Sequence, residues 1–133
     1  MYERELDAIF ADPTHEDAQD RIEQLMDALG WKPARDYVLS VLEAPDRTVA
    51  QWQLAAAVVW WLSCDKRELP VHRVIALVYA RLPHDEGSGE NNLAWSIAST
   101  LEQKSYLSSY DPLADPRVVA ELATVSRRTP PDR

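Results

Sequence analysis

An apolar run near the middle of the chain reads AAAVVWWLSC (residues 55–64) and includes two adjacent tryptophans, Trp60 and Trp61. The apolar stretch from Leu54 to Leu62 is about half the length that a helix needs to cross a bilayer. A helix here would be apolar nearly all round, with Trp52, Ala56 and Val59 on one side and Leu54, Val58 and Trp61 on another. Such a helix is typically covered by neighbours on several sides. We therefore predict a central core helix, with both tryptophans in the core, rather than a membrane anchor. A ligand-binding aromatic wall is the alternative role of the tryptophan pair.

The length and composition are those of one globular domain. The 133 residues are 46% hydrophobic and 27% charged, which is ordinary for a water-soluble protein with a core of its own. The single cysteine, Cys64, excludes an intramolecular disulfide and a multi-cysteine zinc site. The first ten residues, MYERELDAIF, contain no signal-peptide apolar core. We expect one all-helical cytoplasmic domain over residues 1–133, with residues 128–133 as a flexible tail.

Helical periodicity recurs along the chain, whereas the period-2 alternation of strands does not. Asp12 or Thr14 is the predicted N-cap of the second helix, and Gly30 is its predicted stop. Thr48 and Gln51 have the spacing of a capping box at the start of the fourth helix. The seven predicted helices span residues 2–11, 14–29, 33–43, 48–64, 70–82, 93–104 and 115–127.

The predicted helices form a faint repeat. The segments LAAAVVWWL (54–62) and LAWSIASTL (93–101) are alike. Each is followed by a loop, a proline and a second apolar helix, PVHRVIAL (70–77) or PRVVAEL (116–122). RIEQLMDAL (21–29) begins a poorer earlier copy, and the copies end 33 and 39 residues apart, at Leu29, Leu62 and Leu101. Such spacings are typical of helical-hairpin repeats.

With these segments the chain resembles HEAT-like α-solenoid proteins over about residues 14–127, including a helix that begins at an Asp–Pro pair, DPRVV (115–119). The resemblance implies about seven helices in a right-handed stack of antiparallel hairpins. The unequal spacings leave a compact helical bundle as the alternative architecture.

Acidic residues are concentrated at one end of the sequence. The net charge is −8, and residues 1–29 contain nine acidic residues against Arg4 and Arg21. Four of the acids follow an i, i+4, i+7, i+11 spacing, which places them in one stripe along a helix: Glu16, Asp20, Glu23 and Asp27. This charge disfavours direct binding to nucleic acid and favours a basic protein partner. The alternative is a solvated face that keeps the protein soluble.

Other candidates for partner contact lie outside the stripe. Asp36 and Glu43 are expected on the outer face of the third helix, and Trp31 is a candidate anchor. Trp95 falls on the polar side of the sixth predicted helix, which is typical of an interface anchor. Trp95 packed against the preceding loop or a neighbouring repeat is the alternative.

One constellation of histidines suggests metal chemistry. In VHRVIALVYARLPHD (71–85), the residues His72, His84 and Asp85, with Asp111 or Asp115, superficially resemble the metal ligands of HD-type phosphohydrolases. Only twelve residues separate the two histidines, which leaves no room for the helix usually found between them. The dyad also follows a proline in a glycine-containing loop, which would not hold ligands firmly in place. We therefore expect no metal and no cofactor, and keep this enzyme class as the least favoured alternative.

The sequence as a whole favours a non-enzymatic protein-binding module. It contains no phosphate-cradling glycine loop and no nucleophile elbow. In size, acidity and absence of a catalytic motif the chain resembles bacterial immunity proteins, which implies that it neutralises a cognate toxin, commonly a basic nuclease. A general HEAT-like adaptor or scaffold is the alternative, and we expect no contact with membrane or nucleic acid.

Overall fold

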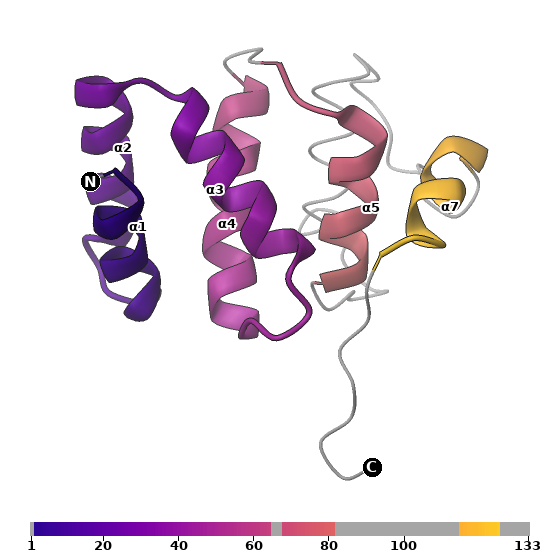
Figure 1. The fold of residues 1–133 in the computed structure, drawn as a ribbon, viewed down its shortest axis with the longest axis horizontal. Coiled ribbons are helices and arrows are strands. Elements are labelled where there is room, and N and C mark those ends of the chain that lie inside the picture. The colour runs from indigo at the N-terminus through magenta and orange to yellow at the C-terminus, as the bar shows by residue number, and fades with distance from the viewer. Residues whose placement is uncertain (1, 65–67, 82–114, 126–133) are drawn as a thin grey trace, which may run out of the picture.

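The computed structural model describes residues 2–64, 68–81 and 115–125, which form six α-helices and no strand (Figure 1). The all-α prediction is therefore confirmed for this part of the chain. The sixth predicted helix, residues 93–104, and the predicted tail, residues 128–133, lie outside the described residues. The helices are α1 (Tyr2–Ala11), α2 (Ala18–Leu29), α3 (Lys32–Glu43), α4 (Val49–Cys64), α5 (Val71–Arg81) and α7 (Pro116–Leu122).

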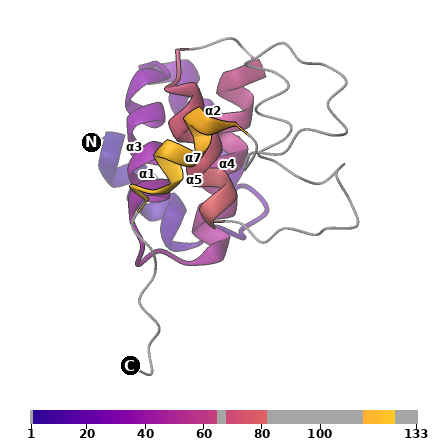
Figure 2. The ribbon, with the colours of Figure 1, turned by 90° about the vertical axis from the view of Figure 1, so that its right-hand side faces the viewer.

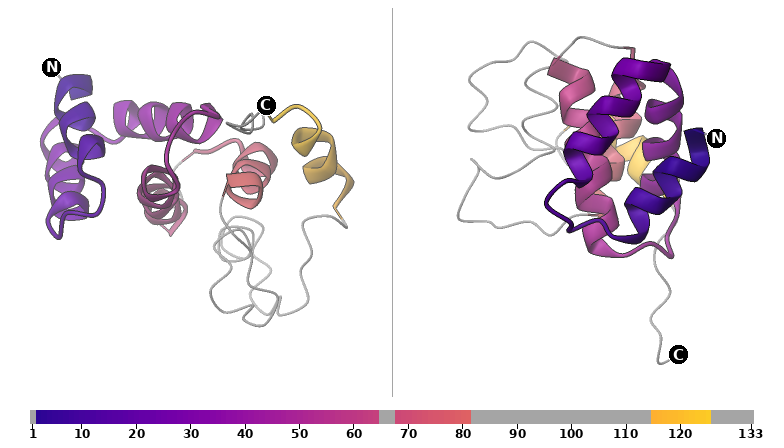
Figure 3. Two further views of the ribbon diagram at one scale, coloured as in Figure 1. Left: turned by 90° about the horizontal axis from the view of Figure 1, so that it is seen from below. Right: turned by 90° about the vertical axis from the view of Figure 1, so that its left-hand side faces the viewer.

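These helices lie in a row. Figure 1 shows α1 and α2 at one end, α3 and α4 in the middle, then α5, and α7 at the other end. The most extensive contacts are between α3 and α4 and between α5 and α7, and α3 also contacts α1 and α5. The view from below in Figure 3 shows the same order, and Figure 2 looks along the row from the α7 end. Within the described ranges, no helix is long and apolar enough to cross a membrane.

The helix α4 provides the centre of the core, as predicted from its apolar sequence. Its buried residues are Trp52, Leu54, Ala55, Ala56, Val58, Val59, Leu62 and Ser63. The prediction that both adjacent tryptophans are core residues was wrong for Trp60, which is 37% exposed, whereas Trp61 is partly buried and packs against the core. Successive helical residues point about 100° apart. At this end of α4 the side chains of Val59 and Leu62 are buried against the rest of the fold, whereas the side chain of Trp60 remains exposed.

The capping box at the start of α4 is confirmed. The Thr48 N–H donates to Gln51 Oε1 at 3.0 Å, and the Gln51 N–H donates to Thr48 Oγ1 at 3.1 Å. The Gln51 side chain also donates from Nε2 to the Phe10 carbonyl at 2.8 Å. The cap therefore satisfies the first turn of α4 and ties it to the end of α1.

The predicted start of α2 at Asp12 or Thr14 was wrong. The helix begins at Ala18, after turns in which the His15 N–H donates to the Asp12 carbonyl at 3.2 Å. The Asp17 N–H donates to His15 Nδ1 at 3.0 Å, so the imidazole takes up an N–H that would otherwise need a cap. The predicted stop is confirmed, because Gly30 has a φ of 97° and its N–H donates to the Met26 carbonyl at 2.9 Å.

The start of α7 at Asp115–Pro116 is also confirmed. The Asp115 side chain accepts a hydrogen bond from the Arg117 N–H at 3.0 Å and so acts as the N-cap. The helix ends at Leu122, earlier than the predicted end near Arg127, and residues 123–125 continue as turns.

A buried arginine joins α3, α4 and α5. Arg81, only 6% exposed, donates from Nε to the Leu42 carbonyl at 2.7 Å and from Nη2 to the Glu43 carbonyl at 3.0 Å. Its guanidinium also lies over the Trp52 ring, 5.2 Å from the centroid, and the Trp52 Nε1–H donates to the Val41 and Ala44 carbonyls at 3.1 and 3.2 Å. The last carbonyls of α3 thus accept hydrogen bonds from the Arg81 guanidinium and from the Trp52 indole N–H. The positive charge of Arg81 is also favourable at the negative end of the α3 helix dipole.

A second link holds α1 against α3. The Tyr37 hydroxyl donates to Asp7 Oδ1 at 2.5 Å, and the Tyr37 ring lies 5.2 Å from that of Phe10. Burial, reinforced by the hydrogen bond to the Asp7 carboxylate, raises the pKa of Tyr37 to about 12. The hydroxyl therefore stays protonated and keeps donating well above neutral pH.

The capping box predicts a measurable loss of stability. Thr48→Ala removes the hydroxyl that accepts from the Gln51 N–H and should lower the free energy of unfolding by about 1 kcal/mol. Thr14→Ala, at the position predicted from sequence but outside any helix, should change it by less than about 0.5 kcal/mol. Urea unfolding followed by circular dichroism measures both, and an equal loss in the two variants would contradict the assignment of the cap.

The buried arginine predicts a larger effect. Arg81→Met keeps an unbranched apolar chain but leaves the α3 carbonyls without their charged donor, so the free energy of unfolding should fall by about 2–3 kcal/mol. Arg21→Met, on the exposed face of α2, is the matched control and should stay within about 0.5 kcal/mol of wild type. If Arg81→Met were as stable as this control, the contacts of Arg81 with α3 and α4 would not stabilise the fold.

Candidate functional site

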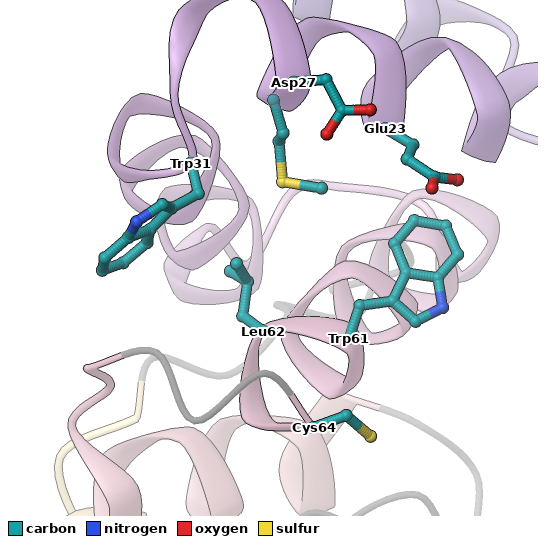
Figure 4. Close-up of a pocket in the computed structure, with 7 residues that line it drawn as sticks. Glu23, Asp27, Trp31, Trp61, Leu62 and Cys64 are labelled. Atoms are coloured by element: carbon teal, nitrogen blue, oxygen red, sulfur yellow. The ribbon is translucent and has the colours of Figure 1, made fainter.

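A pocket of about 400 Å³ opens between the second half of α2 and the C-terminal end of α4 (Figure 4). Its volume falls within the range of roughly 300–1,000 Å³ typical of ligand sites. It is lined by Glu23, Met26 and Asp27 of α2, by Trp31, and by Trp61, Leu62 and Cys64 of α4. Three of the residues predicted for partner contact, Glu23, Asp27 and Trp31, are thus brought together with residues of α4.

Local structure explains how α2 provides the acidic wall of the pocket. Glu23 and Asp27 are one helical turn apart and share a face, while Ile22 is fully buried in the core. The positive φ of Gly30 ends the helix immediately after this turn and lets the chain enter α3 at Trp31. Two exposed carboxylates therefore face the pocket from one fixed element.

The end of α4 provides the opposite wall. Leu62 is buried, Trp61 is partly buried, and Cys64 is exposed at the last helical position. In Figure 4 the Trp61 ring stands on the α4 side of the pocket, and the carboxylates of Glu23 and Asp27 extend from α2. An indole and two carboxylates around one hollow favour a cation, because the π-face of an indole and a carboxylate both attract positive charge.

The two acids of the pocket form no ion pair with any base in the described part of the chain. Among the residues that the structure describes, the lining of the pocket contains two acids and no base. Across the parts of the chain that the structure describes, no ion pair or hydrogen bond engages the carboxylate of Glu23 or Asp27. Two like charges one turn apart repel each other by a few tenths of a kcal/mol, which a bound cation would relieve.

Trp31, predicted from the sequence to be an anchor for the partner, lines the pocket but has cations of its own segment beside its ring. Lys32 Nζ lies 5.9 Å and Arg35 Cζ 5.3 Å from the Trp31 ring centroid, so two cations of its own segment already lie near the indole. In Figure 4 the ring points away from the middle of the pocket. Trp61, on the other side, is therefore the better-placed aromatic wall.

The acidic stripe is exposed along its length, but it does not lie on one helix. Asp20, Glu23 and Asp27 are exposed on α2, whereas Glu16 is exposed in the turns before it. Glu16 lines a second hollow, of about 410 Å³, with residues that include His15 and Gln53. The stripe is interrupted here because α2 begins at Ala18, later than the spacing predicted.

The two acids of α3 have different surroundings. Asp36 is exposed and accepts from Arg35 Nε at 3.0 Å. Glu43, expected to point to solvent, is instead partly buried and pairs with Arg73 through Nε at 2.8 Å and Nη2 at 2.5 Å. Arg73 also bonds to Thr124 and to the Glu121 carbonyl, so Glu43 belongs to a network that joins α3, α5 and the end of α7.

The histidine constellation is described only in part. His72 is partly buried on α5, and Asp115 caps α7, while His84, Asp85 and Asp111 lie outside the described residues. Burial alone would raise the pKa of Asp115, but hydrogen bonds from the Arg117 side chain and backbone outweigh it and lower that pKa, with a smaller contribution from His72. Among the described residues, no group of three or more His, Cys, Asp or Glu side chains is arranged to hold a metal ion.

Trp95, the remaining predicted anchor, also lies outside the described residues.

No protein-family model, curated protein or solved structure matches the chain. The HEAT-like and immunity-protein resemblances therefore stand on the sequence features alone.

Sequence reasoning missed four members of the pocket, Met26, Trp61, Leu62 and Cys64. Met26 and Trp61 were predicted to face the core. A helix that is apolar all round gives no amphipathic signal, so its sequence does not show which side borders a pocket. The one signal pointing the other way was the position of the tryptophans near the helix end, a few residues before the polar residues 65–68.

The network around Arg73 predicts a structural role for Glu43. Glu43→Gln keeps the shape of the side chain but removes the charge paired with Arg73, and should lower the free energy of unfolding by about 1 kcal/mol. Asp36→Asn, which affects the exposed pair with Arg35, should change it by less than about 0.5 kcal/mol. Urea unfolding of the two variants compares them, and equal stabilities would show that the Arg73 network contributes nothing.

Proposed function

We propose that this protein is a non-enzymatic binding module that holds a basic protein against the acidic face of α2. The observation that carries the proposal is the pocket in which Glu23 and Asp27, both without an internal partner among the described residues, face Trp61. Tryptophan side chains are typical anchors at the centres of protein interfaces. The binding surface consists of Glu16, Asp20, Glu23, Asp27 and the pocket.

The distribution of charge supports a basic partner. Nine acids against two bases in residues 1–29 give this end of the molecule a strongly negative field. Such a field attracts a basic protein, raises the association rate at low salt and disfavours acidic competitors. Asp36 lies at the start of α3, near Trp31 in sequence, and extends the acidic surface beyond α2. Glu43 does not extend it, because its carboxylate is partly buried in the pair with Arg73, whereas the carboxylate of Asp36 stays exposed beside Arg35.

Toxin immunity is the form of this function that the sequence favours. A small acidic protein that seats on a basic toxin domain would block it by steric occlusion or by imitating the charge of its substrate. We also propose that the helix pairs stack as HEAT-like hairpins, which agrees with the row of helices in Figure 1. A cytoplasmic location follows from the same proposal.

The test begins with capture of partners from the native organism by the tagged protein at low and moderate salt. The captured basic protein is then purified, and its stoichiometry, affinity and activity are measured in the presence of this chain. We expect one basic partner bound near one-to-one, with its activity inhibited. Several weak partners, none of them inhibited, would instead indicate an adaptor and overturn the immunity proposal.

Neutralising the stripe should weaken this complex. The variant Glu16→Gln/Asp20→Asn/Glu23→Gln/Asp27→Asn should associate with the partner at least about tenfold more slowly at low salt. The difference should shrink near 0.15 M salt, where the Debye length is about 8 Å.

The matched control neutralises four exposed acids outside the stripe, Glu3→Gln/Glu5→Gln/Asp46→Asn/Glu68→Gln, and has the same net charge. It should associate at close to the wild-type rate. Equal slowing in the two variants would mean that only total charge matters, and would contradict a binding surface on α2.

A further inference from the structure

The pocket beside α2 has a chemistry more specific than general acidity. Its wall on one side consists of two carboxylates one turn apart, and its wall on the other includes the Trp61 indole. The lining also includes the apolar side chains of Met26 and Leu62. An occupant therefore needs a positive end, an apolar stem, and a shape that suits an aromatic face.

The positive end is required because both carboxylates are fixed on one helical face without an internal counter-ion among the described residues. An uncharged occupant would leave them facing each other and would displace water from them. An anionic occupant would add a third negative charge. Charge complementarity thus restricts the occupant to a cation.

We propose that the pocket receives one arginine side chain of the basic partner, an assignment that rests on the proposed binding function. A guanidinium is planar and weakly hydrated, so it stacks on an indole and donates to two carboxylates from one fork. Its methylene stem would contact Met26 and Leu62. A lysine ammonium offers the same charge, but it is a compact and strongly hydrated point charge that loses more on leaving water.

The fold shows that this kind of contact is already used in the same molecule. The guanidinium of Arg81 lies 5.2 Å from the ring centroid of Trp52, and that of Arg35 lies 5.3 Å from the ring of Trp31. In both cases the arginine also makes polar contacts from the edge of its guanidinium, to carbonyls or to Asp36. The pocket offers the same combination of an indole face and oxygen acceptors to an arginine from outside.

The experiment uses the full chain and three acetylated tripeptide amides, Gly-Arg-Gly, Gly-Lys-Gly and Gly-citrulline-Gly. Citrulline keeps the size and planarity of arginine without its charge. Nuclear magnetic resonance follows the Trp61 indole Nε1–H and the Met26 methyl signals during titration. We expect saturable shifts in the millimolar range with the arginine peptide, weaker shifts with the lysine peptide, and none with citrulline.

Two isosteric double variants with the same net charge separate the pocket from the general field. Glu23→Gln/Asp27→Asn removes the two charges of the pocket, and the arginine peptide should bind roughly fivefold more weakly. Glu16→Gln/Asp20→Asn removes two charges of the same stripe that do not line the pocket, and binding should stay within about twofold of wild type. All four residues are exposed, so both variants should fold.

The outcomes separate the inference from the function on which it rests. Equal binding of the lysine peptide, binding of citrulline, equal weakening in both double variants, or no shift with any peptide would each overturn the arginine assignment. The same proteins are then tested against the captured partner. Slower association of the quadruple stripe variant would leave the binding function standing even when the arginine assignment fails.

Discussion

The helix α4 has to be covered on every side, and the described part of the structure follows from that requirement. Its apolar residues surround the whole axis, so a single neighbouring helix cannot bury them. The helices α3 and α5 pack against it, and the Trp52–Arg81 contact joins all three at the C-terminal end of α3. The hydrophobic effect thus brings the helices together, and a small number of polar groups fixes the ends at which they meet.

The candidate site arises where this coverage stops. Near the C-terminal end of α4, Val59 and Leu62 are buried, but Trp60 is exposed and Trp61 only partly covered. The acidic face of α2 borders that end, so an aromatic wall and two carboxylates meet at one hollow. This combination is what a basic partner would recognise.

The acidic residues divide into two groups according to what they contact. Asp7 accepts from Tyr37, and Glu43 pairs with Arg73, so these two acids hold helices together. Glu23 and Asp27 face the pocket without such partners within the described residues. All four looked alike in the sequence, because a helical period shows which face a residue occupies but not which side chain lies opposite it.

The sequence by itself determined the described helices and most of their ends, because helix ends depend on residues only a few positions apart. The Thr48–Gln51 cap, the Gly30 stop and the Asp115–Pro116 start are all found where they were predicted. Sequence reasoning failed at the start of α2, where the His15 imidazole takes an N–H that a cap would otherwise satisfy. It also placed Glu23, Asp27 and Trp31 among the candidates for binding. Only the tertiary structure brought Trp61 to them and paired Glu43 with Arg73, because contacts thirty or more residues apart in sequence depend on how helices pack and leave no periodic trace in the chain.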